Sequence, residues 1–286
     1  MKYWLLCFFA VFLSVSLLPI LAANSVAAED PPMITVSIGG VTQEISVEEY
    51  TLRVLIAQNE SCKNPESQKA LAVSARSCAM YFSLYGCKHD SFDACDDGNC
   101  CLTLGSIDGA DSETLGLLAS ITDETKGQIL TLGSMPAMSL FTRCASKGTR
   151  PCEEFPYLTA VPEAERCETH KSEFTYEIND EISELLGDAE QNQPYLIYDA
   201  NEKCEFAIMG GKLIDGEELA VLLELPTVEF EISVSESELS AICYGIGHGY
   251  GLNLCGSEML AESGMVFEKI LEIYFPKLEL NKMYYN

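Results

Sequence analysis

The spacing of apolar and polar residues changes along the chain, and each change predicts a different element. From Pro31 to Ser46, apolar and polar residues alternate on both sides of Gly39-Gly40, which predicts a β-hairpin. After Ser46 the apolar residues recur at helical spacing instead. The pattern therefore predicts a hairpin that leads directly into helices.

The stretch from Tyr50 to Arg76 predicts two helices joined by an elbow. Ser46 and Glu49 form a capping box before the first helix, whose apolar face contains Leu52, Leu55 and Ile56. The second helix starts with Asn64, Pro65 and Glu66 and has an apolar face formed by Leu71, Ala75, Cys78 and Phe82. The polar residues at the elbow, Gln58, Asn59 and Glu60, are placed where side chains can project into a cleft.

Later segments add further strands and helices. Residues 121–132 predict hairpin strands around Lys126-Gly127. Residues 178–190 predict an acidic helix, and residues 195–209 predict strands. Four glycines close together before Asn253 predict a tight loop at the start of another helix. No repeat, low-complexity segment or inter-domain linker is evident, so one domain with insertions is the simpler interpretation.

Charge and composition narrow the possible partners. The chain has 286 residues, of which 48% are apolar, so it can bury a substantial core. Its 44 acidic residues outnumber 17 basic ones, for a formal net charge of −27. Nucleic acid and anionic membrane surfaces would repel such a chain and are not expected as partners.

The first residues predict export. Lys2 precedes a long apolar run that ends in small residues, including Ser25-Val26-Ala27, a suitable cleavage site. The run is also long enough to span a bilayer uncleaved. Residues 1–28 are therefore predicted to be a signal peptide or an N-terminal membrane anchor, and the remainder to be secreted or held on the outer face of the cytoplasmic membrane.

Two segments carry a resemblance to a known family. Residues 50–76 resemble the stage II sporulation protein D and amidase-enhancer (SpoIID/LytB) family, whose pattern is Y-L-R-G-V-V-A-A-E-M-P, a short spacer, and E-A-L-K-A-Q-A-V-A-A-R. Residues 245–264, G-I-G-H-G-Y-G-L-N-L-C-G-S-E-M-L-A-E-S-G, resemble the family's G-x-G-H-G-V-G-M-S-Q-Y-G-A and the helix after it. The resemblance implies an α+β fold, with a single SpoIID-like domain over residues 29–286.

The family's activity is lytic transglycosylation of peptidoglycan glycan strands, and the resemblance puts Gln58 where the family has its catalytic glutamate. An amide neither gives up nor takes a proton, and losing general acid catalysis costs roughly 10²–10⁴ in rate. Thr142 and Leu254 also depart from the family pattern at presumed cleft positions. These departures favour a catalytically impaired protein, or pseudoenzyme, that binds glycan and assists partner hydrolases.

The alternative is an active lytic transglycosylase in which Glu60 replaces the missing acid and base, although this residue can equally be a solvated carboxylate. Arg76, at the family's arginine, would either bind a substrate carboxylate or pair with a nearby acid. His248, between Gly247 and Gly249, would either contact sugar or be a hydrogen-bonded structural residue. The resemblance further implies sporulation, with a cell-wall amidase and a membrane protein as partners.

A cysteine-rich loop follows the second helix. His89, Cys95, Cys100 and Cys101 lie within thirteen residues and have the ligand types of a tetrahedral zinc site. Some clostridial relatives carry a zinc site of the form H-x5-C-x4-H-C at this place, and the spacing here is identical, with Cys100 in place of the second histidine. The alternative is a pair of loop disulfides. A zinc ion bound by these four residues would hold the loop in place and would not take part in catalysis.

The other cysteines and histidines carry less information. The chain has 13 cysteines in all, of which Cys144, Cys152 and Cys167 could include one disulfide. An anoxic habitat, in which exported thiols survive, is one hypothesis for this number. His170 matches no motif and is predicted to be a surface residue.

Overall fold

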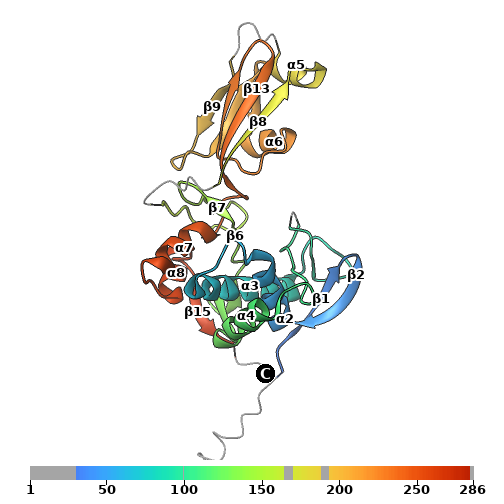
Figure 1. Ribbon diagram of the computed structural model, residues 1–286, viewed down its shortest axis with the longest axis vertical. Helices are drawn as coiled ribbons and strands as arrows, with labels where there is room; N and C mark the ends of the chain where they lie inside the picture. The colour runs from blue at the N-terminus through green and yellow to red at the C-terminus, as the bar shows by residue number, and fades with distance from the viewer. Residues whose placement is uncertain (1–29, 99, 164–169, 188–192, 284–286) are drawn as a thin grey trace, which may run out of the picture.

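Two separate hydrophobic cores organise the chain. The computed structural model describes residues 30–98, 100–163, 170–187 and 193–283, so the predicted leader lies outside the described residues. One core belongs to a part that we call the body, residues 30–163 and 247–283. The other belongs to the lobe, residues 170–246, which projects from one end of the body (Figure 1).

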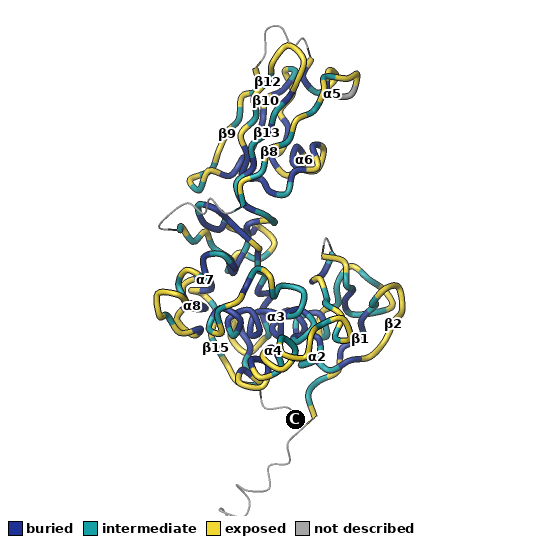
Figure 2. Tube along the Cα trace, viewed as in Figure 1, coloured by how far each residue is buried: buried dark blue, intermediate teal, exposed yellow. Residues whose placement is uncertain are grey.

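The prediction of an α+β fold is confirmed, because the described residues combine seven helices with several small sheets. No helix among them is long and apolar enough to cross a membrane. The body contains most of the helices, and a dark-blue buried centre runs along α3 in Figure 2.

The hairpin predicted around Gly39-Gly40 is confirmed. Strands β1 (Met33–Ile38) and β2 (Val41–Ser46) pair antiparallel, and both turn glycines have positive φ, which the turn requires. The short strand β3 (Ala94–Cys95) pairs parallel with β1. The cysteine-rich loop is thereby attached to the first sheet.

The two helices and their elbow are confirmed as well. Helix α2 (Val47–Gln58) begins where the Ser46 hydroxyl accepts a hydrogen bond from the Glu49 amide, and α3 (Pro65–Tyr85) begins where the Asn64 side chain accepts one from the Glu66 amide. The predicted inner face of α3 is fully buried. In α2, by contrast, Leu52 and Ile56 are only half-buried, because the helix faces the core with other residues: Val47, Tyr50, Thr51, Val54 and Leu55.

The hairpin predicted over residues 121–132 is wrong. The first half of this segment ends a helix, α4 (Ser112–Glu124), whose amino terminus is capped by the Asp111 carboxylate. Only the second half is a strand, β4 (Gln128–Leu132), which pairs with β5 (Met135–Pro136) and β15 (Glu279–Lys282). The cap lies ten residues upstream of the predicted strands and starts a helix that continues through Ile121.

The rest of the body surrounds α3. The short strands β6 (Phe141–Thr142) and β14 (Leu252–Asn253) pair with each other, and β14 leads into α7 (Leu254–Glu262) and α8 (Phe267–Tyr274). The predicted helix start near Asn253 is confirmed. Helices α7 and α8 both contact α3, so residues from the two ends of the chain share one core.

The lobe is built of small antiparallel sheets. Strand β13 (Glu238–Ile246) lies between β8 (Lys171–Glu177) and β12 (Phe230–Val234), and a second sheet has the order β11, β10, β9. Its elements, apart from those three strands, are α5 (Asp180–Leu186), β9 (Tyr195–Tyr198), β10 (Cys204–Met209), β11 (Lys212–Asp215) and α6 (Gly216–Leu222). The single domain predicted for residues 29–286 stays a prediction, with the lobe as its insertion.

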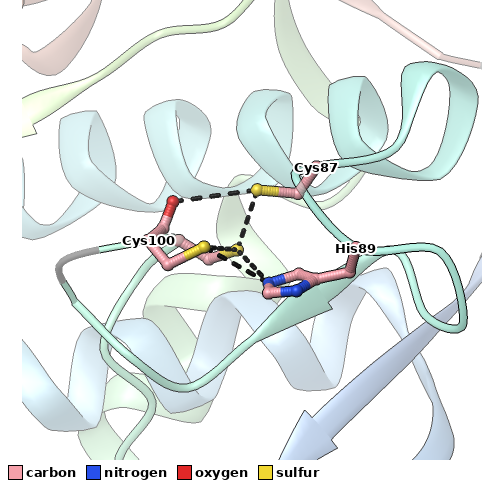
Figure 3. A group of neighbouring side chains, drawn as sticks. Cys87, His89 and Cys100 are labelled. Carbon is pink, nitrogen blue, oxygen red and sulfur yellow. Dashed lines mark hydrogen bonds between the residues drawn. The ribbon is translucent and has the colours of Figure 1, made fainter.

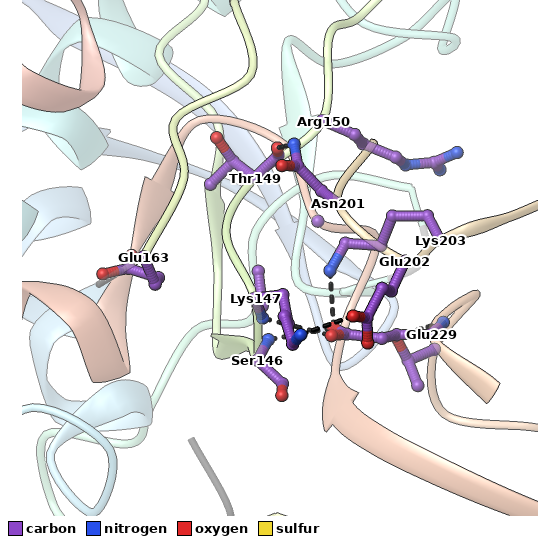
Figure 4. Close-up of polar contacts among 12 residues, drawn as sticks. Ser146, Lys147, Thr149, Arg150, Glu163, Asn201, Glu202, Lys203 and Glu229 are labelled. Atoms are coloured by element: carbon purple, nitrogen blue, oxygen red, sulfur yellow. Dashed lines mark hydrogen bonds and ion pairs between the residues drawn. The ribbon is translucent and has the colours of Figure 1, made fainter. Parts of the chain in front are cut away.

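A buried ion pair lies where the lobe meets the body (Figure 4). The Lys203 ammonium and the Glu229 carboxylate are 2.5 Å apart, and both side chains are almost completely buried. Glu229 also accepts hydrogen bonds from the backbone amides of Ser146 and Lys147, at 2.9 and 3.1 Å. Strand β7 (Cys144–Ala145) pairs with the end of β13 beside them, so the junction is hydrogen-bonded as well as packed.

Candidate functional site

The elbow between α2 and α3 carries the two residues predicted to be catalytic. Gln58 is the last residue of α2 and is half-buried, and its carbonyl accepts a hydrogen bond from the Ser61 amide at 2.9 Å. Glu60 lies in the turn after the helix. Its side chain is 80% exposed and pairs with Lys63 at 3.6 Å. The Glu60 carboxylate is therefore a solvated group.

Helix α7 holds the elbow in place. The Glu258 carboxylate accepts hydrogen bonds from the backbone amides of Lys63 and Asn64, at 2.8 and 2.9 Å. One turn away, the hydroxyls of Ser67 and Ser257 are 2.6 Å apart and buried. These contacts join residues almost 200 positions apart, and they fix the backbone that presents Gln58.

The glycine-rich loop that precedes α7 is held by Thr142, one of the positions that depart from the family pattern. The Thr142 hydroxyl donates to the Ile246 carbonyl at 3.3 Å and accepts from the Gly249 amide at 3.2 Å. Gly247 has a φ of 106°, and a Cβ there would lie 2.5 Å from the same hydroxyl. Threonine and glycine at these positions therefore belong to one tight loop.

His248 lies on the outer side of this loop, in a network of polar contacts. Its Nδ1 accepts a hydrogen bond from the Tyr250 amide at 3.0 Å, and its ring stacks on Tyr250. The Arg150 guanidinium lies over the other ring, 4.2 Å from the Tyr250 centroid, and also pairs with Glu217 of the lobe. The network links the loop to the lobe.

The electrostatics of this network act on His248. Desolvation in the loop and the nearby Arg150 guanidinium both lower the pKa of His248, to about 4. The residue is nevertheless exposed at the surface, which limits how far desolvation can act. In either case the imidazole is neutral at neutral pH and offers a hydrogen-bonding edge to solvent.

Arg76 is completely buried in the body. Its guanidinium pairs with Glu48 at 2.7 Å and donates to the carbonyls of Thr122 and Gln128, both at 3.2 Å. The side chain therefore has no surface with which to touch a substrate. This arrangement corresponds to the structural alternative, a pair with a nearby acid, and it ties α3 to α2, α4 and β4.

A group of cysteine and histidine side chains gathers in the loop after α3 (Figure 3). The ligand atoms of Cys87, His89, Cys100 and Cys101 all lie within 4.8 Å of one another. His89 Nε2 is 3.3 Å from the Cys100 sulfur and 3.9 Å from the Cys101 sulfur, and the sulfurs of Cys87 and Cys101 are 3.1 Å apart.

These distances can be compared with a tetrahedral zinc site. Bond lengths of about 2.3 Å to sulfur and 2.0–2.1 Å to nitrogen place two thiolates about 3.8 Å apart and a thiolate and an imidazole nitrogen about 3.6 Å apart. Four of the six separations, from 3.1 to 3.9 Å, lie around these values, and all six are below 4.8 Å. The group can therefore hold a metal ion.

The membership of the group differs from the predicted ligands at one position. His89, Cys100 and Cys101 are present, but Cys87 takes the place predicted for Cys95. Cys95 is buried in β3, with its sulfur 4.0 Å from the Asp97 carbonyl. The family spacing predicted Cys95 as a ligand. The sequence feature that could have indicated Cys87 is its position two residues before His89.

The predicted site residues lie away from the cavity of about 560 Å³ that the lobe contains. That cavity is lined by residues including Tyr176, Asn179, Ile182, Lys212 and Leu223. None of its lining residues belongs to the elbow, the glycine-rich loop or the cysteine-rich loop. The candidate functional residues are therefore on the elbow of the body and in the loop before α7, outside this cavity.

Comparisons with known proteins support the resemblance seen in the sequence. A family model described as Stage II sporulation protein matches residues 39–132, which include the elbow and the cysteine-rich loop. Stage II sporulation protein D of Bacillus subtilis (strain 168) is 23% identical over 261 residues, covering 84% of this chain and 76% of that protein. Its counterpart in Bacillus amyloliquefaciens is 22% identical over 260 residues, covering 84% and 75%. These similarities support the resemblance of the chain to the SpoIID family.

Proposed function

We propose that this protein is an exported, catalytically impaired SpoIID-family protein that binds peptidoglycan glycan strands during sporulation. The observation that carries the proposal is Gln58, an amide at the family's catalytic glutamate, on an elbow that the Glu258 carboxylate holds by two backbone amides. A glycosidic bond needs a proton donor to be cleaved, and an amide can only hydrogen-bond the same oxygen. The elbow can thus recognise glycan without cleaving it.

The alternative is an active lytic transglycosylase that uses Glu60. One observation favours it: α2 ends at Gln58, so Glu60 is free of the helix that would turn it away. Against it, the side chain is 80% exposed and pairs with Lys63. General acids are usually enclosed by apolar groups that favour the protonated form, and this carboxylate has no such enclosure.

We further propose that zinc occupies the group of Cys87, His89, Cys100 and Cys101. The support is the set of three thiols and one imidazole at tetrahedral separations, which is the ligand set of a closed structural site. Four protein ligands leave no open position for a substrate. The ion would fasten the loop after α3 to the body.

The partners follow from the same proposal. A glycan-binding protein without its own acid would act by presenting strands to other enzymes, and we propose a cell-wall amidase and a membrane sporulation protein as these partners. The site of action would be the outer face of the cytoplasmic membrane. Nucleic acid is not proposed as a partner, because the net charge of −27 opposes it.

The test is digestion of purified, peptide-free glycan strands, with anhydro-sugar products measured by mass spectrometry and glycan binding measured in parallel. We expect binding but no products from the unmodified protein. Gln58→Glu restores the acid, and we expect it to raise the rate of cleavage by roughly 10²–10⁴. Gln58→Asn is the matched control, since it keeps an amide.

Two outcomes would contradict the proposal. Products from the unmodified protein that disappear in Glu60→Gln would establish the active alternative. Absence of glycan binding in the unmodified protein and in Gln58→Glu would remove glycan as the ligand. Binding without cleavage in both proteins would leave the binding role intact and show that the elbow lacks more than a proton donor.

A further inference from the structure

A second group of sulfur and nitrogen ligands lies at the junction of body and lobe, far from the first. It consists of Cys144 in β7, His170 directly before β8, and Cys255 in the first turn of α7. The three ligand atoms lie within 4.8 Å of one another, and the Cys255 sulfur is 3.5 Å from His170 Nδ1. We propose that this group is a second zinc site, independent of the first.

The distance between Cys255 and His170 suits zinc, and all three ligand atoms lie within 4.8 Å of one another. A thiolate and an imidazole nitrogen bound to one zinc ion lie about 3.6 Å apart, close to the 3.5 Å between Cys255 and His170. Two thiolates and one imidazole balance the charge of Zn²⁺. Because His170 and Cys255 are only half-buried, water can reach the fourth coordination position. Cys144 is buried and forms the inner wall of the site.

Backbone hydrogen bonds hold the three ligand-bearing segments together. The Cys255 amide donates to the Arg143 carbonyl at 3.2 Å, and the Gly245 amide donates to the His170 carbonyl at 3.1 Å. Ile246 of β13 is paired with Cys144 of β7. The ligands are therefore positioned by main-chain contacts and not by side-chain packing alone, which is the preorganisation that a metal site needs.

The Asn253 side chain adds a further support. Its carbonyl oxygen accepts from the Ala145 amide at 3.0 Å, and its amide nitrogen donates to the Ala145 carbonyl at 2.9 Å. Asn253 directly precedes α7, and Ala145 directly follows a ligand. This pair of hydrogen bonds keeps the carriers of Cys144 and Cys255 at a constant separation.

A disulfide between Cys144 and Cys255 is the competing arrangement. It would require the two sulfurs to approach to about 2.05 Å, and it would leave the His170 imidazole beside a bond that cannot use it. Zinc uses all three groups. A bound zinc ion would connect β7 and α7 of the body with the first strand of the lobe. It would thereby fix the orientation of the lobe relative to the body.

The chain has three histidines, which provide a matched set of variants. The full-length chain is purified without oxygen, and its zinc content is measured by inductively coupled plasma mass spectrometry. We expect two zinc ions per chain. His89→Ala should lose the first ion, His170→Ala the second, and His248→Ala neither, since His248 belongs to neither group.

Replacement of zinc by cobalt gives an independent readout. Absorption from sulfur to cobalt scales with the number of thiolates, so the band lost in His170→Ala should be weaker than the band lost in His89→Ala. Cys255→Ser, which keeps the size of the side chain, should also remove the second ion if His170→Ala proves too unstable to purify. Thermal melts confirm that each variant is folded.

Three results would overturn the proposal. One is a single zinc ion per chain that His89→Ala removes. Another is two ions in both His170→Ala and Cys255→Ser. The third is a Cys144–Cys255 disulfide in protein kept free of oxygen. None of these results depends on glycan binding, so the second zinc site and the proposed function can fail separately.

Discussion

The body and the lobe bury their residues in different ways. In the body, α3 is enclosed on nearly every side, with 14 of its 21 residues buried. In the lobe, β8 alternates between exposed and half-buried residues, and β9 is mostly exposed. A region whose central helix is buried on most sides is stabilised by its own core. A small sheet with one solvent-exposed face buries less apolar surface and depends more on contacts with its neighbour. We infer that the lobe relies on the junction more than the body does.

The described residues of each region also include a buried ion pair. The two pairs differ in whether they connect the body with the lobe. Arg76 and Glu48 are joined entirely within the body. Glu229, the partner of Lys203, additionally accepts hydrogen bonds from two backbone amides at the start of the segment after β7. The pair in the body thus stabilises a core, and the other pair stabilises a junction.

The largest expected effect comes from breaking the pair in the body. Arg76→Met keeps most of the side-chain volume but leaves the Glu48 carboxylate without its partner, so we expect a loss of about 3–5 kcal/mol in the free energy of unfolding. Denaturant titration followed by circular dichroism measures it. Lys269→Met, in a pair that is more than 60% exposed, is the control and should change stability by less than about 1 kcal/mol. A loss as small as that of the control would show that the buried pair of Arg76 and Glu48 does not stabilise the body more than an exposed pair does.

Breaking the junction pair should have a more local effect. Lys203→Met leaves Glu229 buried without its cation, and we expect a loss of about 3 kcal/mol that is confined to the lobe. Hydrogen exchange measured by mass spectrometry should show faster exchange in β10 and β13, with β1 and α3 unchanged. Lys171→Met, in an exposed pair, is the control. Equal acceleration in both regions would show that body and lobe unfold as one unit, and the comparison would no longer hold.

The smallest expected effect concerns the loop that touches both regions. The folded-state pKa of His248 is lowered towards about 4, whereas an unfolded histidine titrates near about 6.5. The contribution of this residue to stability is therefore complete above about pH 6.5 and is lost as the pH falls through the folded-state pKa.

NMR titration of the His248 ring measures this shift directly. We expect a midpoint below about 6.5, and a higher midpoint in Arg150→Met, because that variant removes the nearby positive charge. Glu268→Gln, a change in α8 on the body surface, is the control and should leave the midpoint unchanged. A midpoint at or above the unfolded value would show that neither the loop nor Arg150 acts on the ring.

Local signals were sufficient for the elements around the elbow. The caps at Ser46 and Asn64 and the glycine pair of the first hairpin are interactions between residues only a few positions apart, so the sequence contains them in full. The same reasoning failed at residues 121–132. There, alternating residues around a glycine suggested strands, but the segment begins inside a helix that starts at an upstream cap.

The candidate site was only partly predictable for a related reason. Gln58, Glu60 and the cysteine-rich loop are close in sequence and could be recognised by their spacing. The presence of Cys87 in place of Cys95 could not be predicted, because both residues are suitable ligands. Which of them joins the group depends on the pairing of β3 with β1, which places Cys95 in a strand. The contact between Glu258 and the elbow could not be predicted either, because it joins residues 195 positions apart.

The sequence by itself determined the resemblance to the SpoIID family, the helix starts and the amide at position 58, because each depends on residue type or short spacing. Only the tertiary structure decided that Arg76 is buried, and that the lobe has a separate core. It alone brought Cys144, His170 and Cys255 together. These features arise where segments separated in the sequence meet, from 28 residues for Glu48 and Arg76 to 85 for His170 and Cys255. No local pattern encodes which distant partners a side chain will contact.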